Sequence, residues 1–163
     1  MRLYRFVGPP EIGDRVRGEA GYLIRSQTDL ANWLHRHPEA ITEAATFVVD
    51  QVGLLRLAPR RSEHVDCAAG GQVYAAGEMR FSPEHALAEV TNQSTGYCPE
   101  PSCWPAVALA LTDAGIAAPS GFTSSFIFRR CTVCGTTNLV KEAWFVCGAC
   151  DADLPAAWNF DDD

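Results

Sequence analysis

Two stretches of the chain place apolar residues at helical spacing, and they predict the main helices. In the first, Leu30, Trp33 and Leu34 lie on one face of a helix over residues 27–37, because positions three and four apart share a helix face. A Ser-Gln-Thr-Asp segment directly before them is typical of a helix N-terminus, and Pro38 ends the helix.

The second helix is predicted over residues 103–114. Pro105 falls in its first turn, where the missing backbone N–H breaks no helical hydrogen bond. Gly115 follows its last residue and suits a helix C-terminus.

Short apolar runs bounded by turn residues predict the strands. They cover residues 2–7, 46–50, 54–57, 72–81, 86–91 and 125–129. The sequence therefore predicts an α+β fold, with a small mixed or antiparallel sheet and two main helices in a domain at residues 1–125. A small module at 126–160 and an acidic tail at 161–163 follow.

Two CxxC pairs dominate the predicted module. Cys131 and Cys134 form the first pair and Cys147 and Cys150 the second. Two residues between cysteines let one tight turn direct both thiolates at a single ion, and Gly135 suits a turn that needs positive φ. With a short hairpin of residues 138–140 and 143–146 between the pairs, the pattern predicts a zinc ribbon. A redox CxxC or disulfides are the alternatives.

The predicted cofactor is one structural Zn²⁺. Four thiolates fill all coordination positions, so none remains for a reactive water. The module is too small to bury much core, and we expect metal binding to supply most of its folding energy. Arg129 and Arg130 precede the first cysteine. One interpretation is that they contact phosphate or an acidic partner. The alternative is that one of them covers the sheet edge as a solvated charge.

Composition narrows the class of protein. A formal charge of −7 on 163 residues disfavours indiscriminate nucleic-acid binding, which needs a positive surface. No stretch reaches the roughly 18 consecutive apolar residues of a membrane helix, and no signal peptide is visible. We therefore expect a cytoplasmic protein without a membrane partner. In that reducing compartment, CxxC pairs are metal ligands sooner than disulfides.

Polar side chains gather in two further segments. Arg60, Arg61 and His64 follow one predicted strand, Glu78 lies in the next, and residues 94–100 lead into the second helix. Loops at strand ends often carry function, and a helix N-terminus favours anions. The candidate catalytic residues are His64, Glu78 and Tyr97, and the candidate ligand-binding residues are Arg60, Arg61, Ser94 and Glu100.

Each catalytic candidate has a structural alternative. His64 is either a general base tuned by a nearby carboxylate or a hydrogen-bonded strand histidine. Glu78 points inward to a partner or outward to solvent. Tyr97 is more often a core aromatic residue with a satisfied hydroxyl group.

The remaining three cysteines raise a second possibility. His64, Cys67, Cys98 and Cys103 together offer four potential ligands for another metal ion, although small buried thiols are the default interpretation. Cys98, near a helix start, is also a candidate catalytic cysteine.

Residues 46–118 resemble the core domain of plant IQ-motif calmodulin-binding proteins and related bacterial domains with an SGHY-P loop. The resemblance places His64 at the family histidine, residues 75–77 at its Ala-Ala-Gly strand, and Ser94, Tyr97 and Pro99 at its loop. Gly96 stands where the family loop has histidine, and the chain lacks an evident calmodulin-binding helix. The resemblance therefore implies neither a reaction nor calmodulin as a partner.

Two functions follow from these patterns. The first is a binding or adaptor module that presents a contact surface to a protein or nucleic acid. The second is an enzyme or receptor for a small anionic, nucleotide-like ligand, in which arginines bind the charge and His64 or Glu78 moves a proton. The second requires His64, Glu78 and Ser94 or Tyr97 to converge on one pocket.

Overall fold

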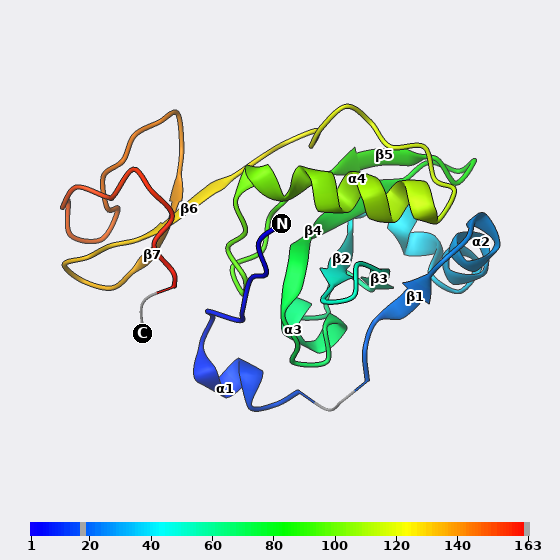
Figure 1. Ribbon diagram of the computed structural model, residues 1–163, viewed down its shortest axis with the longest axis horizontal. Helices are drawn as coiled ribbons and strands as arrows, with labels where there is room; N and C mark the ends of the chain where they lie inside the picture. Colours follow the sequence, from blue (N-terminus) through cyan, green and yellow to red (C-terminus); the bar gives the residue numbers. More distant parts are fainter. Residues whose placement is uncertain (17–18, 162–163) are drawn as a thin grey trace.

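A five-stranded antiparallel sheet forms the centre of the larger lobe (Figure 1). The computed structural model describes residues 1–16 and 19–161, so Asp162 and Asp163 of the predicted acidic tail lie outside the described residues. The strand order is β1-β3-β2-β4-β5. Their bounds are β1 Tyr22–Ile24, β2 Ala45–Asp50, β3 Leu55–Ala58, β4 Val73–Phe81 and β5 Leu87–Val90. The predicted α+β class and antiparallel sheet are confirmed.

The two longest helices lie where the hydrophobic pattern predicts them. They are α2 Gln27–Arg36 and α4 Trp104–Asp113; the shorter elements are α1 Pro10–Gly13, α3 His64–Cys67, and the 3₁₀ turns η1 Pro38–Ile41 and η2 Pro101–Cys103. The Ser26 hydroxyl group accepts a hydrogen bond from the Asp29 amide at 3.1 Å, which satisfies one free donor at the start of α2. Gly115 follows α4 with φ of 71°, a conformation that favours glycine.

The sheet has one covered face and one partly open face. Helix α4 lies across the first face (Figure 1), and Phe47, Phe81 and Leu111 are among the fully buried residues of the core. Side chains alternate between faces along a strand, so Thr46 and its cross-strand partner Glu78 point to the other face. Helix α3 covers only part of this second face.

The N-terminal segment makes a single bridge instead of the strand predicted over residues 2–7. Tyr4 pairs with Val73 through two backbone hydrogen bonds of 2.7 and 2.9 Å. Three residues later, the Val7 amide donates to the Gly96 carbonyl oxygen at 2.7 Å. The segment therefore leaves the sheet after one pair, and no ladder develops.

The smaller lobe, residues 126–161, is named here the cysteine module. Strand β6 Ile127–Arg130 pairs with β7 Thr137–Val140. The predicted hairpin of residues 138–140 with 143–146 is wrong, because the partner of β7 is β6. Glu142 and Ala143 have φ values of 52° and 56°, and two consecutive left-handed residues interrupt an extended strand. Val146 makes only an isolated bridge to Asp153.

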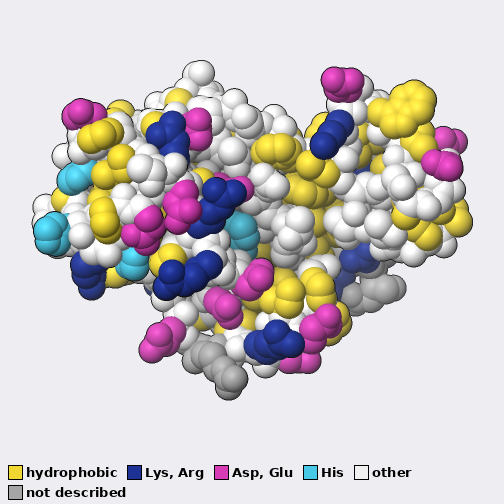
Figure 2. All heavy atoms as spheres, turned by 180° about the vertical axis from the view of Figure 1, so that it is seen from behind, with side chains coloured by type: hydrophobic (Ala, Val, Ile, Leu, Met, Phe, Trp, Pro, Cys, Tyr) yellow, Lys and Arg dark blue, Asp and Glu magenta, His cyan; other side chains and the backbone are white. Residues whose placement is uncertain are grey.

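A shared apolar cluster joins the module to the larger lobe. Phe128 and Phe160 pack with Cys98 in this buried cluster. The Trp158 ring lies 5.5 Å from the Phe160 ring and 5.5 Å from the Tyr4 ring, measured between centroids. From behind, hydrophobic side chains form a band where the two lobes meet (Figure 2).

The last described residues return to the first ones. An Arg2 guanidinium nitrogen lies 3.8 Å from an Asp161 carboxylate oxygen, and the Arg2 guanidinium group lies 4.6 Å from the centre of the Trp158 ring. Arg5 donates to the carbonyl oxygens of Phe160 and Asp161 at 3.4 and 3.2 Å. The two ends of the described chain are therefore bound to each other.

Candidate functional site

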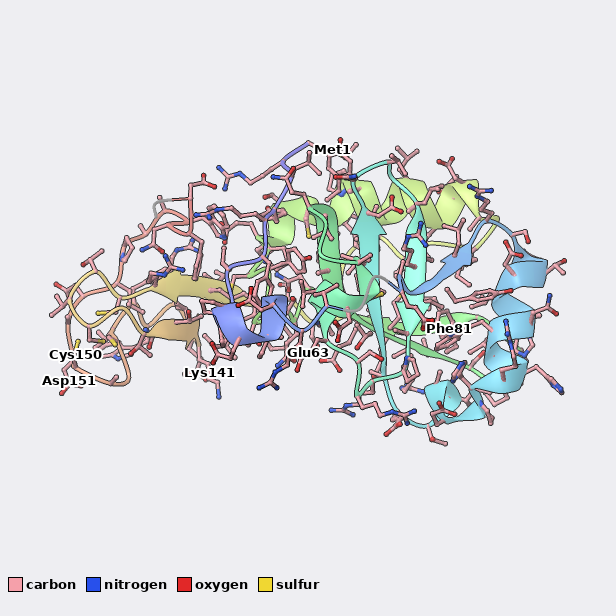
Figure 3. All side chains as sticks on the ribbon, turned by 90° about the horizontal axis from the view of Figure 1, so that it is seen from below. Met1, Glu63, Phe81, Lys141, Cys150 and Asp151 are labelled. Carbon is pink, nitrogen blue, oxygen red and sulfur yellow. The ribbon has the colours of Figure 1, made fainter. Side chains whose placement is uncertain are left out.

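Four cysteine sulfurs converge at the end of the module that lies farthest from the sheet, near the labelled Cys150 in Figure 3. Sγ of Cys131 lies 3.5 Å from that of Cys150, and Sγ of Cys134 lies 3.6 Å from that of Cys147. All four sulfurs lie within 4.8 Å of one another. Tetrahedral zinc with bonds of about 2.3 Å requires sulfur separations of about 3.8 Å. The donor set therefore fits one tetrahedral metal ion.

The two CxxC turns have matching backbones. The Gly135 amide donates to the Cys131 carbonyl oxygen, and the Asp151 amide donates to the Cys147 carbonyl oxygen, both at 3.0 Å. Gly135 has φ of 78°, as its place after the second cysteine predicts, and Asp151 has φ of 60° at the equivalent position. Aspartate is one of the few residues with a side chain that tolerate this conformation.

Hydrogen-bond donors surround the buried sulfurs. The Val133 amide donates to Sγ of Cys131 at 3.4 Å, and the Ala149 amide and the Asn138 side chain both donate to Sγ of Cys147 at 3.4 Å. The Ala149 amide, followed by the Asn138 amide group, lowers the pKa of Cys147 to about 6. A thiolate is the form that binds a metal ion, and these donors favour it.

Asn138 also connects the two halves of the module, a role that sequence reasoning missed. Its side-chain oxygen accepts a hydrogen bond from the Gly148 amide at 2.9 Å, while its nitrogen donates to the Thr136 carbonyl oxygen at 3.0 Å. The residue lies in β7, and it fixes the second CxxC turn against the first. Bonds of this outer kind orient metal ligands.

A polar pocket of about 250 Å³ lies between α3, the middle of β4 and the loop before α4. It is lined by Thr46, Arg60, Arg61, Ser62, Glu63, His64, Glu78, Gln93, Ser94 and Thr95. Five of the seven predicted catalytic and ligand-binding residues are in this set. Glu63, labelled in Figure 3, marks the start of α3 beside the pocket. The sheet, α3 and the loop thus bring together side chains that lie far apart in the sequence.

One tautomer of neutral His64 is selected by a hydrogen bond. Its Nε2 lies 2.8 Å from the Gly77 carbonyl oxygen, and a carbonyl oxygen only accepts, so the proton of the neutral ring lies on Nε2. Burial lowers the pKa of His64, while the bond to Gly77 acts in the opposite direction. Neutral His64 therefore keeps Nδ1 as a hydrogen-bond acceptor. His64 is the first residue of α3. The structural alternative, a hydrogen-bonded histidine in a strand, is therefore wrong about the element but right about the hydrogen bond.

The charges of the pocket are mixed. The Arg60 Nε lies 4.0 Å from a Glu78 carboxylate oxygen, and the two side chains are 58% and 22% exposed. Two adjoining hollows of about 320 and 420 Å³ share Arg60 and extend past Arg80 and Glu39. Figure 2 shows the resulting mixture of acidic and basic side chains over the larger lobe, seen from the side opposite α4.

Ser94 is held at the pocket wall by its own loop. It is 1% exposed, and its hydroxyl group accepts a hydrogen bond from the Tyr97 amide at 3.2 Å. Tyr97 itself points elsewhere: its ring is fully buried, and its hydroxyl group donates to the Gly71 carbonyl oxygen at 2.7 Å. Burial raises the pKa of Tyr97.

Glu100 faces the cysteine module and does not line the pocket. Its carboxylate oxygens lie 2.8 and 3.4 Å from the two terminal nitrogens of Arg129. Arg129 is 4% exposed and also donates to the carbonyl oxygens of Phe128 and Ala156. Arg130 lies over the Phe160 ring, 5.1 Å from its centre. Neither arginine covers a sheet edge as a free solvated charge.

The candidate second metal group is dispersed. Within residues 1–16 and 19–161, the four-cysteine cluster of the module is the only group of three or more potential ligands at metal-binding distance. Cys67 is the last residue of α3 and donates to the Arg56 carbonyl oxygen at 3.7 Å, whereas Cys98 belongs to the cluster with Phe128. Burial raises the pKa of Cys67, Cys98 and Cys103 to about 12 in each case, so these thiols are protonated and poor nucleophiles at neutral pH.

Sequence reasoning also missed Gln93, Thr95 and Asn92. Gln93 and Thr95 line the pocket, and only their place beside Ser94 could have indicated it. Asn92 is fully buried. Its side-chain nitrogen donates to the carbonyl oxygens of Pro99 and Phe126, and its side-chain oxygen accepts a hydrogen bond from the Phe126 amide. A single asparagine at a strand end carries no signal for that role.

Comparisons of this chain with protein-family models, curated proteins and solved structures found no match. None of the helices in the described part of the chain has the length and apolar character needed to cross a bilayer. The positions of the side chains are therefore the basis on which a function is inferred.

Proposed function

We propose that this protein binds a small anionic, nucleotide-like ligand in the polar pocket, and that a structural zinc ion holds its cysteine module folded. One observation carries the proposal. Arg60, Arg61, His64, Glu78 and Ser94 come from three separate segments, and all five line one hollow. A concave site with a few convergent polar groups is the usual form of a small-ligand site.

The pocket offers complementary groups for such a ligand. Arg60 and Arg61 supply guanidinium groups, which bind phosphate or carboxylate oxygens through paired hydrogen bonds. Glu78 and neutral Nδ1 of His64 accept hydrogen bonds from hydroxyl groups, such as those of a ribose. His64 Nδ1 is also the atom that takes a proton if the ligand reacts in the pocket.

The metal is proposed to be zinc. Cys131, Cys134, Cys147 and Cys150 would hold it, and four thiolates around one tetrahedral ion are typical of structural zinc. The ion would supply folding energy to the module and no reactive water. Elemental analysis of the purified protein is expected to give one zinc per chain, and a folded protein without metal would contradict the proposal.

The charges of the module favour contact with the larger lobe over nucleic-acid binding. Its most buried cation, Arg129, is engaged with Glu100. The exposed charged residues of the module are Lys141, Glu142, Asp151, Asp153 and Asp161, and four of these five are acidic. A phosphate-binding surface requires the opposite balance.

A protein contact is the second candidate function, and it is favoured by two exposed apolar residues of the module. Val133 is 74% exposed and Trp144 is 71% exposed, and aromatic residues are enriched at protein interfaces. Cross-linking through Lys141 followed by mass spectrometry would identify a partner. Replacing Trp144 with alanine is expected to abolish that cross-link if the module is an adaptor.

The resemblance of residues 46–118 to the IQ-motif core domain agrees with the location of the site. It places His64 and Ser94 among the family motifs, and both line the pocket. It adds no reaction and no partner to the proposal.

Calorimetric titration of the zinc-loaded protein with pyrophosphate and then with ADP tests the pocket. Arg61→Gln is expected to weaken binding about tenfold, since a hydrogen bond to a charged group contributes about 1.5–3 kcal/mol. Arg25→Gln is the matched control, because Arg25 is exposed and lines none of the pockets around Arg60. Absence of binding, or an equal loss in both variants, would reject the pocket as an anion site.

A further inference from the structure

The loop over residues 93–99 has the pocket on one side and the cysteine module on the other. Gln93, Ser94 and Thr95 line the pocket. Cys98, four residues after Ser94, packs in the apolar cluster with Phe128 and Phe160 of the module. One short loop therefore contacts both the pocket and the module.

Three groups of hydrogen bonds attach this loop to the module. At its start, the Asn92 side chain accepts from the Phe126 amide at 2.7 Å and donates to the Phe126 carbonyl oxygen at 2.8 Å. Near its end, the indole nitrogen of Trp158 donates to the Cys98 carbonyl oxygen at 2.7 Å. After its end, Glu100 holds Arg129 through two contacts of 2.8 and 3.4 Å.

The loop itself adopts a conformation that needs such support. Cys98 has φ of 46°, and a left-handed backbone is unfavourable for a residue with a side chain unless the surroundings impose it. The Cys98 amide donates to the Ser94 carbonyl oxygen at 2.8 Å. The bend that presents Ser94 to the pocket therefore depends on Cys98 staying in place.

We infer that the metal-bound module is a positioning brace for the pocket, so that zinc binding and anion binding strengthen each other. This inference rests on the proposed function of the pocket. Without metal, the module loses most of its folding energy, and β6 and residues 154–160 no longer hold the loop. A ligand must then order residues 93–99 itself, which lowers its affinity. Because linkage is reciprocal, a bound anion raises the affinity for zinc by the same factor.

The first test measures the loop and needs no ligand. The protein is treated with iodoacetamide, with and without a zinc chelator, and labelling of each cysteine is followed by peptide mass spectrometry. Chelation is expected to accelerate labelling of Cys98 at least about tenfold, because local opening governs access to a buried thiol. Cys67, the last residue of α3, is buried and donates to the Arg56 carbonyl oxygen of the larger lobe, so it is the internal control and is expected to change less than about twofold.

Two results would contradict the inference that the module positions the loop. Cys98 could stay protected after the metal is removed, which would mean that the loop holds its position without the module. Alternatively, Cys67 could become labelled as fast as Cys98, which would mean that metal loss unfolds the whole chain and moves no loop selectively.

The second test measures the coupling. Pyrophosphate is titrated into the zinc-loaded wild type, the chelated wild type, Glu100→Gln and the control Glu84→Gln, which lies in the β4–β5 turn away from the module. Chelation and Glu100→Gln are expected to weaken binding about tenfold, within the usual range of coupling between sites, and Glu84→Gln to leave it unchanged.

The outcomes separate the two claims. Equal pyrophosphate affinity in all four samples rejects the coupling and leaves the pocket proposal intact. If the zinc-loaded wild type binds neither pyrophosphate nor ADP, the proposed function fails, whereas the labelling of Cys98 still decides whether the module braces the loop.

Discussion

His64 donates its Nε2 proton to the carbonyl oxygen of Gly77 at 2.8 Å, and this bond ties the first residue of α3 to the middle of β4. It links the helix to the sheet at the wall of the pocket that His64 lines. Burial of this ring makes the stability of the protein dependent on pH.

The first prediction concerns that dependence. Burial holds the pKa of His64 below the unfolded value of 6.5, so near that value the unfolded chain binds more protons than the folded one. The contribution of neutral His64 to stability is therefore complete above pH 6.5 and is lost as the pH falls below it.

Urea unfolding of the wild type at several pH values between 7.5 and 5.5 checks this window. His64→Gln, which can still donate to Gly77, is expected to flatten this part of the profile, whereas His35→Gln, at an exposed position on α2, is expected to keep it. Identical profiles for the wild type and His64→Gln would contradict the assignment.

The second prediction concerns Gly77, where β4 and the chain after β5 approach closely. A Cβ atom at this position would collide with the Thr91 carbonyl oxygen and lie 2.9 Å from the Phe47 ring. Gly77→Ala is expected to lower the free energy of unfolding by about 3 kcal/mol, the upper end for overpacking in a core. Gly121→Ala is the control, because no atom lies within 4 Å of its added Cβ. Similar urea midpoints for both variants would show that the strands separate easily.

The third prediction compares the two CxxC turns. Gly135 and Asp151 occupy equivalent left-handed positions with φ of 78° and 60°. Asp151→Gly is expected to raise the free energy of unfolding of the zinc-loaded module by about 0.5 kcal/mol, and Gly135→Ala to lower it by about 1 kcal/mol. Competition with a chromophoric chelator should order the zinc affinities of the variants in the same way. The reverse order would mean that the Asp151 side chain itself supports the site.

The fourth prediction concerns the ion pair of Arg129 with Glu100. Arg129→Ala leaves Glu100 without its partner and also removes donors from two carbonyl oxygens. Loss of one member of a buried pair costs about 3 kcal/mol, whereas Lys141→Ala, at an exposed position of the module, is expected to change stability by less than about 0.5 kcal/mol. Thermal unfolding of the zinc-loaded proteins measures both, and equal stabilities would show that the pair is dispensable.

The local patterns predicted most of the elements, because their causes lie in neighbouring residues. Ser26 caps α2, and the alternating residues of β4 are buried on one face as their period of two requires. The cysteine spacing located the metal ligands for the same reason: each CxxC turn is a local structure, and only two such turns need to meet.

The remaining features depend on contacts between distant segments. Nothing near Arg129 in the sequence indicates Glu100, and the polarity of the pocket residues indicates their grouping without their geometry. Tyr97 and Glu100 belong to the same polar loop as Ser94, but the Tyr97 hydroxyl group bonds to Gly71 and the Glu100 carboxylate group to Arg129. The partner of β7 was missed because two left-handed residues, Glu142 and Ala143, have no recognisable signature.

Arg2 and Tyr4 lie against Asp161 and Trp158, which are more than 150 residues away along the chain. A contact that closes so long a loop costs more chain entropy than a contact between neighbouring residues. The packing of the two intervening lobes offsets that cost, because it holds the two distant segments close together.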